Sequence, residues 1–393
     1  QKQSVFITAV IAVAVLFWGY DAWKQYRLTN QGWPELDGGL YAEAMVVDDV
    51  SYLIPGDQAY ETGVAKDGIP AINDPKYISV NAADNVIADD LYGIDVEVNG
   101  EHRYYPYQIM NWHEVVNDTF GDKDLLVTYC TLCGVPKVYE RQLDGVTQEF
   151  GVSGKVYNNN TLLYDKATDS LWLQATGQAV VGSSVGKSLS VYPSAMPMRW
   201  GDWKAAYPNG DVLSTETGFV RDYTRHPYGS YEKSPAIYFP MNFVGTSFGN
   251  KWIVSLVDVA DDSAAFAWNV LMGIGIQEDE IGGTPAVAVY DHELDVARVF
   301  DRRVGDKTLT FTFDFDAKEL RDTETGSRWN VEGLAISGEM KGERMSEVLS
   351  SVMYSVCAQS LFPEMRPVGG EVASDDEEVD PIEIDVSDSN VST

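Results

Sequence analysis

Residues 116–141 read VNDTFGDKDLLVTYCTLCGVPKVYER, and they overlie residues 277–302, QEDEIGGTPAVAVYDHELDVARVFDR, without a gap. Both segments alternate apolar and polar side chains in short runs that Gly and Asp interrupt, which is typical of β-hairpins. Farther along the chain, YDKATDSLW (164–172) recurs as RDTETGSRW (321–329). Internal self-similarity of this kind indicates a duplicated structural unit.

The matched stretches predict a β-rich α+β fold that consists of two related modules in a pseudo-symmetric tandem. We expect a short helix ahead of the hairpins of each module, in YPYQIMNWHEVVND (105–118) and AAFAWNVLMGIGI (264–276). The expected order is a transmembrane anchor (1–30), an irregular lead-in (31–92), the first module with a Cys-x-x-Cys motif (93–215), a linker (216–244), the second module (245–365) and an acidic tail (366–393).

The N-terminus carries an uncharged run from Val5 to Tyr20. As a helix this run would span roughly 24 Å, slightly less than the ~30 Å hydrocarbon core of a bilayer. Bulky side chains follow the small ones of AVIAVA, which disfavours a cleaved secretory signal. We therefore expect one retained transmembrane helix preceding the two modules. The residues expected to form its membrane anchor are Phe6, Ile7, Ile11, Leu16, Phe17 and Trp18.

The charge pattern bears on location and partners. A net charge of −32 argues against nucleic-acid binding, because the surface could not neutralise a row of phosphates. The acidic tail has no aromatic residues and cannot fold alone, so we expect other subunits of a membrane complex to hold it. The basic residues flanking the anchor do not fix its orientation. The paired thiols favour a body on the periplasmic or extracellular side.

Cys130 and Cys133 form a Cys-x-x-Cys turn between two expected strands. Two sulfurs presented together suit copper or zinc, and His113 on the preceding helix could be a third ligand. A Cys130–Cys133 disulfide and a pair of free or redox-active thiols are the alternatives. A redox pair usually lies at a helix N-terminus, so the strand flanks disfavour thioredoxin-like chemistry. His113 could equally be a histidine satisfied within a packed helix face, and Cys357, in apolar surroundings, is expected to be a buried small hydrophobe.

The overlay separates residues that the fold requires from residues that serve one module. Cys130 faces Asp291, Cys133 faces Leu294 and His113 faces Ile274. The same turn can therefore form without thiols, and we expect the two cysteines and the histidine to have a task performed only once in the molecule.

Four stretches carry a resemblance to a known family: YPYQIMNWHEVVND, VTYCTLCGVPKVYER, FGVSGKVYNNNTLLYDKATDSLW and WGDWKAAYP. They resemble the bacterial and archaeal family of domains of unknown function numbered 3179. The resemblance covers residues 93–215, and residues 245–345 resemble a second, degenerate copy. It implies a domain and no activity.

These observations leave three function hypotheses. The first is a membrane-anchored extracytoplasmic accessory or structural subunit of a larger respiratory or photosynthetic type of membrane complex. The second is a membrane-tethered copper- or zinc-binding protein that uses His113, Cys130 and Cys133. The third is a thiol oxidoreductase. Because phosphate-loop and serine-nucleophile motifs are absent, the sequence favours a non-enzymatic role and singles out no catalytic residue.

Overall fold

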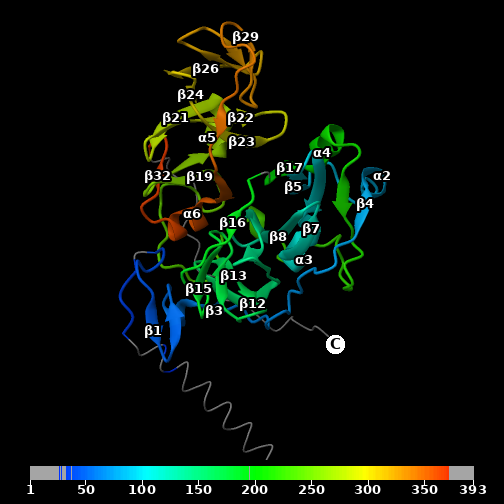
Figure 1. The fold of residues 1–393 in the computed structure, drawn as a ribbon, viewed down its shortest axis with the longest axis vertical. Helices are drawn as coiled ribbons and strands as arrows, with labels where there is room; N and C mark the ends of the chain where they lie inside the picture. Colours follow the sequence, from blue (N-terminus) through cyan, green and yellow to red (C-terminus); the bar gives the residue numbers. More distant parts are fainter. Residues whose placement is uncertain (1–25, 27, 29–31, 37, 194, 371–393) are drawn as a thin grey trace, which may run out of the picture.

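We describe the fold from a computed structural model, which places residues 26, 28, 32–36, 38–193 and 195–370 (Figure 1). Strands dominate these residues, and the prediction of a β-rich fold is confirmed. The predicted anchor and most of the acidic tail lie outside the described residues. Among the helices that are described, none combines the length and the apolar character needed to cross a membrane.

Short elements precede the first half of the body. They are β1 (Met45–Val47), β2 (Val50–Tyr52), η1 (Gly56–Gln58), β3 (Tyr60–Glu61), β4 (Tyr77–Ser79) and α2 (Val80–Ala83). These strands do not form a layer of their own. Instead β1, β2 and β3 extend a sheet of the first half at its two edges, and β4 extends another.

The first half contains three larger sheets, the two-stranded sheet β10-β11 and two short helices. Its elements are β5 (Tyr92–Val98), β6 (Glu101–Pro106), α3 (Tyr107–His113), β7 (Val115–Phe120), β8 (Lys123–Cys130), β9 (Val135–Glu140), β10 (Gln142–Leu143), β11 (Val146–Thr147), β12 (Phe150–Tyr157), β13 (Asn160–Asp165), β14 (Leu171–Leu173), β15 (Gln178–Val181), β16 (Ser190–Val191), β17 (Ala195–Arg199), α4 (Trp200–Ala206) and β18 (Asp211–Leu213).

After a connection that includes η2 (Tyr231–Lys233), the second half follows. Its elements are β19 (Ile253–Val259), β20 (Asp262–Ala267), α5 (Trp268–Ile274), β21 (Ile276–Ile281), β22 (Thr284–Asp291), β23 (Val296–Asp301), β24 (Arg303–Val304), β25 (Lys307–Thr308), β26 (Phe311–Asp314), β27 (Glu319–Asp322), β28 (Arg328–Trp329), β29 (Ala335–Ser337), β30 (Ser346–Glu347), β31 (Ser351–Tyr354), α6 (Ser355–Leu361) and β32 (Arg366–Pro367).

The sheets of the two halves have the same strand order. The order β17-β5-β6-β18 in the first half corresponds to β31-β19-β20-β32 in the second, and the last strand of each series runs parallel to its neighbour. The order β16-β9-β8-β7 corresponds to β30-β23-β22-β21, and β12-β13-β14-β15 to β26-β27-β28-β29. Helices α3 and α5 lie where the sequence predicts them, directly before the hairpins.

A buried aspartate turn closes the β13–β14 connection. The Asp165 carboxylate accepts a hydrogen bond from Trp172 Nε1 at 2.8 Å and another from the Thr168 backbone N–H at 2.6 Å. In the second half, Asp322 accepts a bond from Trp329 Nε1 at 2.9 Å. These side chains are buried, so they serve the fold, as expected from their place in both sequence copies.

The two halves share a core. The largest cluster of buried apolar side chains joins residues of β8 and the following turn to residues of β19, β31 and α6. The Tyr354 backbone N–H donates to the Cys133 carbonyl at 2.7 Å across this contact. At a second contact, Tyr92 Oη donates to Asp295 at 2.7 Å and an Arg199 Nη donates to the Glu293 carbonyl at 2.6 Å. In each half, the turn that connects the matching pair of hairpin strands packs against the other half. These are the β8–β9 turn of the first half and the β22–β23 turn of the second.

Candidate thiol and disulfide site

Cys133 forms a disulfide with Cys357 of α6, 224 residues away, with a Cα–Cα distance of 5.6 Å. In this structure Cys133 therefore pairs with Cys357 and not with Cys130, so the Cys130–Cys133 disulfide, one of the alternatives, is not the bond present, and the expectation of Cys357 as a simple buried hydrophobe is wrong. The physical reason is tertiary. Packing of α6 against the turn after β8 brings Cys357 to Cys133, and nothing local in the sequence announces that contact. The bond covalently joins the two halves.

Cys130 remains a free thiol and is fully buried. It ends β8, and the Cys133 backbone N–H donates to the Cys130 carbonyl at 3.3 Å, which closes the turn between them. Both sulfur atoms lie against the same acceptor. Cys130 Sγ is 3.9 Å and Cys133 Sγ is 3.3 Å from the carbonyl oxygen of Asn159. The free thiol sulfur and a disulfide sulfur therefore both lie close to the Asn159 carbonyl oxygen.

The Asn159 carbonyl belongs to the tight turn of the β12–β13 hairpin. Asn158 and Asn159 have φ values of 48° and 62°, a conformation that asparagine tolerates better than most residues. Hairpin turns usually face solvent, but this one is buried. The Asn158 amide donates to the Ser360 carbonyl of α6 at 3.1 Å, and the Asn159 amide donates to the Leu132 carbonyl at 3.0 Å. The turn is thus fixed between the cysteine turn and α6.

Glu114 supplies a buried carboxyl group to the same site. Tyr228 Oη donates to Glu114 Oε1 at 2.6 Å, and Thr161 Oγ1 donates to Oε2 at 2.9 Å. Thr161 Oγ1 also lies 3.4 Å from Cys130 Sγ. One hydroxyl group therefore connects the thiol to the carboxylate, in a geometry that can pass a proton from sulfur to Glu114.

The backbone of Glu114 is unusual for its residue type. It ends α3 at φ 57°, ψ −22°, where a side chain is sterically disfavoured. At the matching end of α5 the second half has Gly275, with φ 82°. The fold alone favours glycine at this point. In the first half, this position instead holds a glutamate whose carboxyl group bonds the Thr161 hydroxyl that contacts the Cys130 thiol.

Lys251 contributes an amine from the residues before β19. Its Nζ lies 3.5 Å from the centre of the Tyr231 ring and, among the described residues, has no hydrogen-bond partner. Burial lowers the pKa of Lys251 to about 7, an effect opposed by its attraction to Cys130. Burial, together with the nearby Glu114 charge, raises the pKa of the Cys130 thiol to about 11. Cys130 is therefore protonated in this closed arrangement.

The Glu114 carboxyl is also affected by its surroundings. Burial raises the pKa of Glu114, and the hydrogen bonds from Tyr228 and Thr161 oppose that shift. The carboxyl is thus a better proton acceptor than an exposed glutamate. A thiol, a carboxyl group of raised basicity and an amine, all removed from water, form a set suited to thiol chemistry.

His113 takes no part in this cluster. Its Nδ1 lies 2.7 Å from the Pro70 carbonyl and its Nε2 lies 2.7 Å from Tyr223 Oη, so both ring nitrogens have partners. Burial lowers the pKa of His113 to about 4. Within the described part of the chain, no group of three or more His, Cys, Asp or Glu side chains is arranged to hold a metal ion. The structure does not bring His113 together with Cys130 and Cys133.

Most residues around the Cys130 thiol were not identified from the sequence. Glu114 could have been identified from the sequence, because the overlay aligns it with Gly275 and the two residue types differ strongly. Asn159 and Thr161 lie in a stretch that carries the family resemblance, and no sequence pattern assigns them a role. Lys251 and Cys357 reach the site through tertiary packing, and no local pattern identifies them.

Comparison with known proteins agrees with the sequence motifs. Neither the curated proteins nor the solved structures give a significant match to the chain. A family model described as Protein of unknown function (DUF3179) matches residues 66–365, which include the cysteine turn, Glu114, Lys251 and Cys357. The chain therefore belongs to this family of proteins of unknown function.

Proposed function

We propose that this protein performs thiol–disulfide exchange at a centre formed by Cys130, Cys133 and Cys357. The observation that carries the proposal is the free Cys130 thiol in the same turn as the disulfide-bonded Cys133. A hydrogen-bonded turn of four residues holds its end Cα atoms within about 7 Å. A disulfide needs about 4.4–6.8 Å between Cα atoms, so a Cys130–Cys133 bond is within reach of the same turn.

The exchange step requires no external oxidant. The Cys130 thiolate attacks Cys133 Sγ, a Cys130–Cys133 bond forms, the Cys133–Cys357 bond breaks, and Cys357 leaves as a thiolate. The number of thiols and disulfides stays the same. The Cys130 proton passes through the Thr161 hydroxyl to Glu114, and a proton returns to Cys357 as it is released. Lys251, in its protonated form, is attracted to the Cys130 thiolate and stabilises it.

This chemistry also has a structural consequence. In one disulfide state the halves are covalently linked through Cys357, and in the other the bond is confined to the cysteine turn. The second half has Asp291, Leu294 and Gly275 where the first half has Cys130, Cys133 and Glu114. We infer that the two halves are related modules, of which one holds the nucleophile and the other supplies Cys357.

The exchange can be followed by trapping free thiols with N-ethylmaleimide in the native protein at about pH 8. Acid quenching and non-reducing peptide mapping then show which cysteine is labelled. We expect label on Cys357 to accumulate in the wild type, and none at that position in Cys130→Ala. Glu114→Gln keeps the side-chain size but replaces one acceptor oxygen by a donor and removes the proton acceptor, so it should slow Cys357 labelling by at least about tenfold.

Glu140→Gln is the matched control, because Glu140 is a partly exposed acid on β9 whose partner is Lys123. In this variant, Cys357 should be labelled at the wild-type rate. Circular dichroism establishes that each variant is folded. If label enters only Cys130 and never Cys357, the exchange does not occur and the proposal fails.

We also propose, from the sequence, that the protein is a membrane-anchored extracytoplasmic subunit of a larger complex. The uncharged run from Val5 to Tyr20 and the acidic tail support this proposal. Extraction in mild detergent followed by affinity purification tests it. Stoichiometric membrane partners are expected, and removal of residues 1–27 should release a folded body. A protein that migrates alone, or a truncated body that stays in salt-washed membranes, would contradict it.

A further inference from the structure

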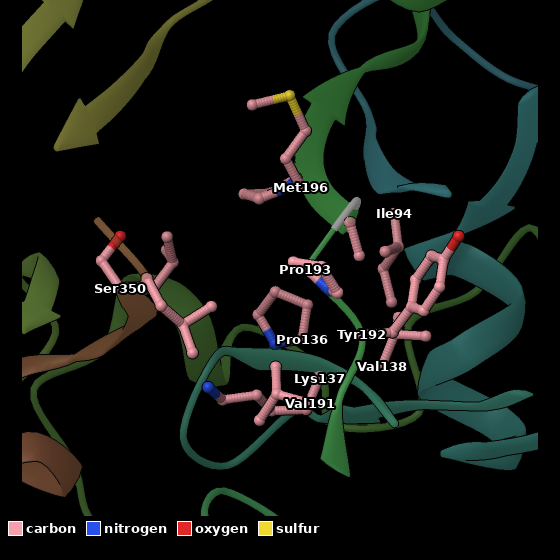
Figure 2. A pocket seen from close by; sticks show the side chains of 13 residues that line it. Ile94, Pro136, Lys137, Val138, Val191, Tyr192, Pro193, Met196 and Ser350 are labelled. Carbon is pink, nitrogen blue, oxygen red and sulfur yellow. The ribbon is translucent and has the colours of Figure 1, made fainter. Parts of the chain in front are cut away.

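A cleft lies between the two halves (Figure 2), and no cysteine is among the residues that line it. Its lining is mainly apolar and comes from both halves: Ile94, Pro136, Val191, Met196, Leu349 and Val352. Figure 2 shows Met196 and Ser350 on opposite sides of the space, with Pro136 and Lys137 at its base. The space is about 430 Å³, including its open mouth. Most of this volume belongs to the open mouth, so the enclosed part suits only a small ligand.

Two basic residues at matched positions lie at this cleft: Lys137 lines it, and Arg298 contacts the lining residue Met196. Lys137 of β9 pairs with Thr128 across the hairpin, and Arg298 of β23 pairs with Val289 in the same register. The sequence overlay aligns Lys137 with Arg298 directly. Whereas the Cys-x-x-Cys turn occurs in the first half only, a cation occupies this position in both halves.

Each cation reaches across to the opposite half. Lys137 lines the cleft and its Nζ donates to the Ser351 hydroxyl, while an Arg298 Nη donates to the sulfur of Met196, a lining residue, at 3.4 Å. Neither contact supplies a negative charge. Arg298 Nε is buried and has no hydrogen-bond partner in residues 38–193 and 195–370.

The lack of carboxylate partners is unusual for this chain. With 60 acidic and 28 basic residues, acids are in excess everywhere. Lys204, for example, contacts both Asp84 and Asp89. Lys137 is only 9% exposed, yet no described acid forms an ion pair with it, and burial lowers its pKa to about 8. Buried charges are normally paired, so a cation in this state lacks a counter-ion.

We propose that the cleft binds a small organic carboxylate, whose oxygens pair with Lys137 and Arg298 while its apolar part contacts Pro136 and Val352. The apolar lining favours a carbon chain over a bare inorganic anion. Two cations from opposite halves favour a ligand that bridges them. This inference is independent of the thiol chemistry, because no cysteine lines the cleft.

Isothermal titration calorimetry with sodium butyrate as the probe tests the site, with n-butanol and sodium sulfate as comparison ligands. We expect butyrate to bind the wild type more tightly than either. Lys137→Met and Arg298→Met keep the side-chain bulk without the charge, and each should weaken butyrate binding at least about tenfold. Lys137→Arg restores the charge and should retain binding.

Lys187→Met is the control, because Lys187 is an exposed lysine that pairs with Asp144. It should bind butyrate like the wild type, and unchanged melting curves show that the variants are folded. The proposal is overturned if the wild type does not bind butyrate. It is also overturned if butanol or sulfate binds as well as butyrate, or if Lys137→Met and Arg298→Met retain wild-type affinity.

Discussion

At the scale of single residues, His113 shows how burial sets a pH response. It is fully buried between the Pro70 carbonyl and the Tyr223 hydroxyl, and its pKa in the folded protein is about 4. An unfolded chain binds the proton at about pH 6.5. His113 therefore makes its full contribution to the free energy of unfolding above pH 6.5. That contribution is lost as pH falls toward 4, because the unfolded state takes up the proton first.

We predict that the free energy of unfolding falls by roughly 2 kcal/mol on account of His113 between about pH 7.5 and about pH 5. Urea unfolding of the wild type and His113→Gln at both pH values measures it. The glutamine variant cannot take up a proton at this position. Between the two pH values its free energy of unfolding should therefore fall by roughly 2 kcal/mol less than that of the wild type. Glu114, whose raised pKa acts in the opposite sense, is present in both proteins and cancels in the difference. An equal pH dependence in the two would contradict the assignment.

Glu114 and Cys130 show how far residue-level reasoning on the sequence could reach. The overlay identifies Cys130 as specific to one half, and the structure places it in a cluster of reactive side chains. The same overlay sets Glu114 against Gly275, a contrast readable from the sequence. The sequence could not show that His113 lies apart from the cysteines, because helix geometry fixes its direction but not what packs against it.

At the scale of elements, local sequence patterns correctly predicted the strands around the cysteine turn and the helices before the hairpins. Alternating side chains around the cysteine turn became β8 and β9, and the helices α3 and α5 lie within the expected segments. These elements depend on periodicity and turn residues, which a sequence displays directly. Sheet order depends on long-range pairing. No local pattern reveals that β18 and β32 each run parallel to a strand of an otherwise antiparallel sheet.

The buried aspartate turns give a prediction for these elements. Asp165 and Asp322 each accept bonds from a buried tryptophan and from nearby backbone or threonine groups. Asp165→Asn and Asp322→Asn replace one acceptor oxygen by a donor, so we expect each to lower the free energy of unfolding by about 1–3 kcal/mol. Chemical unfolding measures both. A loss in one variant with no change in the other would contradict an equivalent role for the two turns.

At the scale of the whole molecule, one disulfide, a shared core and hydrogen bonds hold the two halves of the chain against each other. Cys133–Cys357 closes a loop of more than 200 residues, and chain-entropy arguments give such a bond a stabilisation of about 5 kcal/mol. The turn that holds Cys133 also holds the free Cys130 thiol. A change of disulfide partner within this turn would therefore alter the connection between the halves without any gain or loss of electrons.

The pairing of the three cysteines is the central claim of this account, and peptide mapping measures it directly. The protein, prepared without reductant, is denatured in acid with N-ethylmaleimide, digested and analysed by mass spectrometry without reduction. We predict that the main species joins Cys133 to Cys357 and carries label on Cys130. A main species that joins Cys130 to Cys133 with label on Cys357, or label on all three cysteines, would contradict the account.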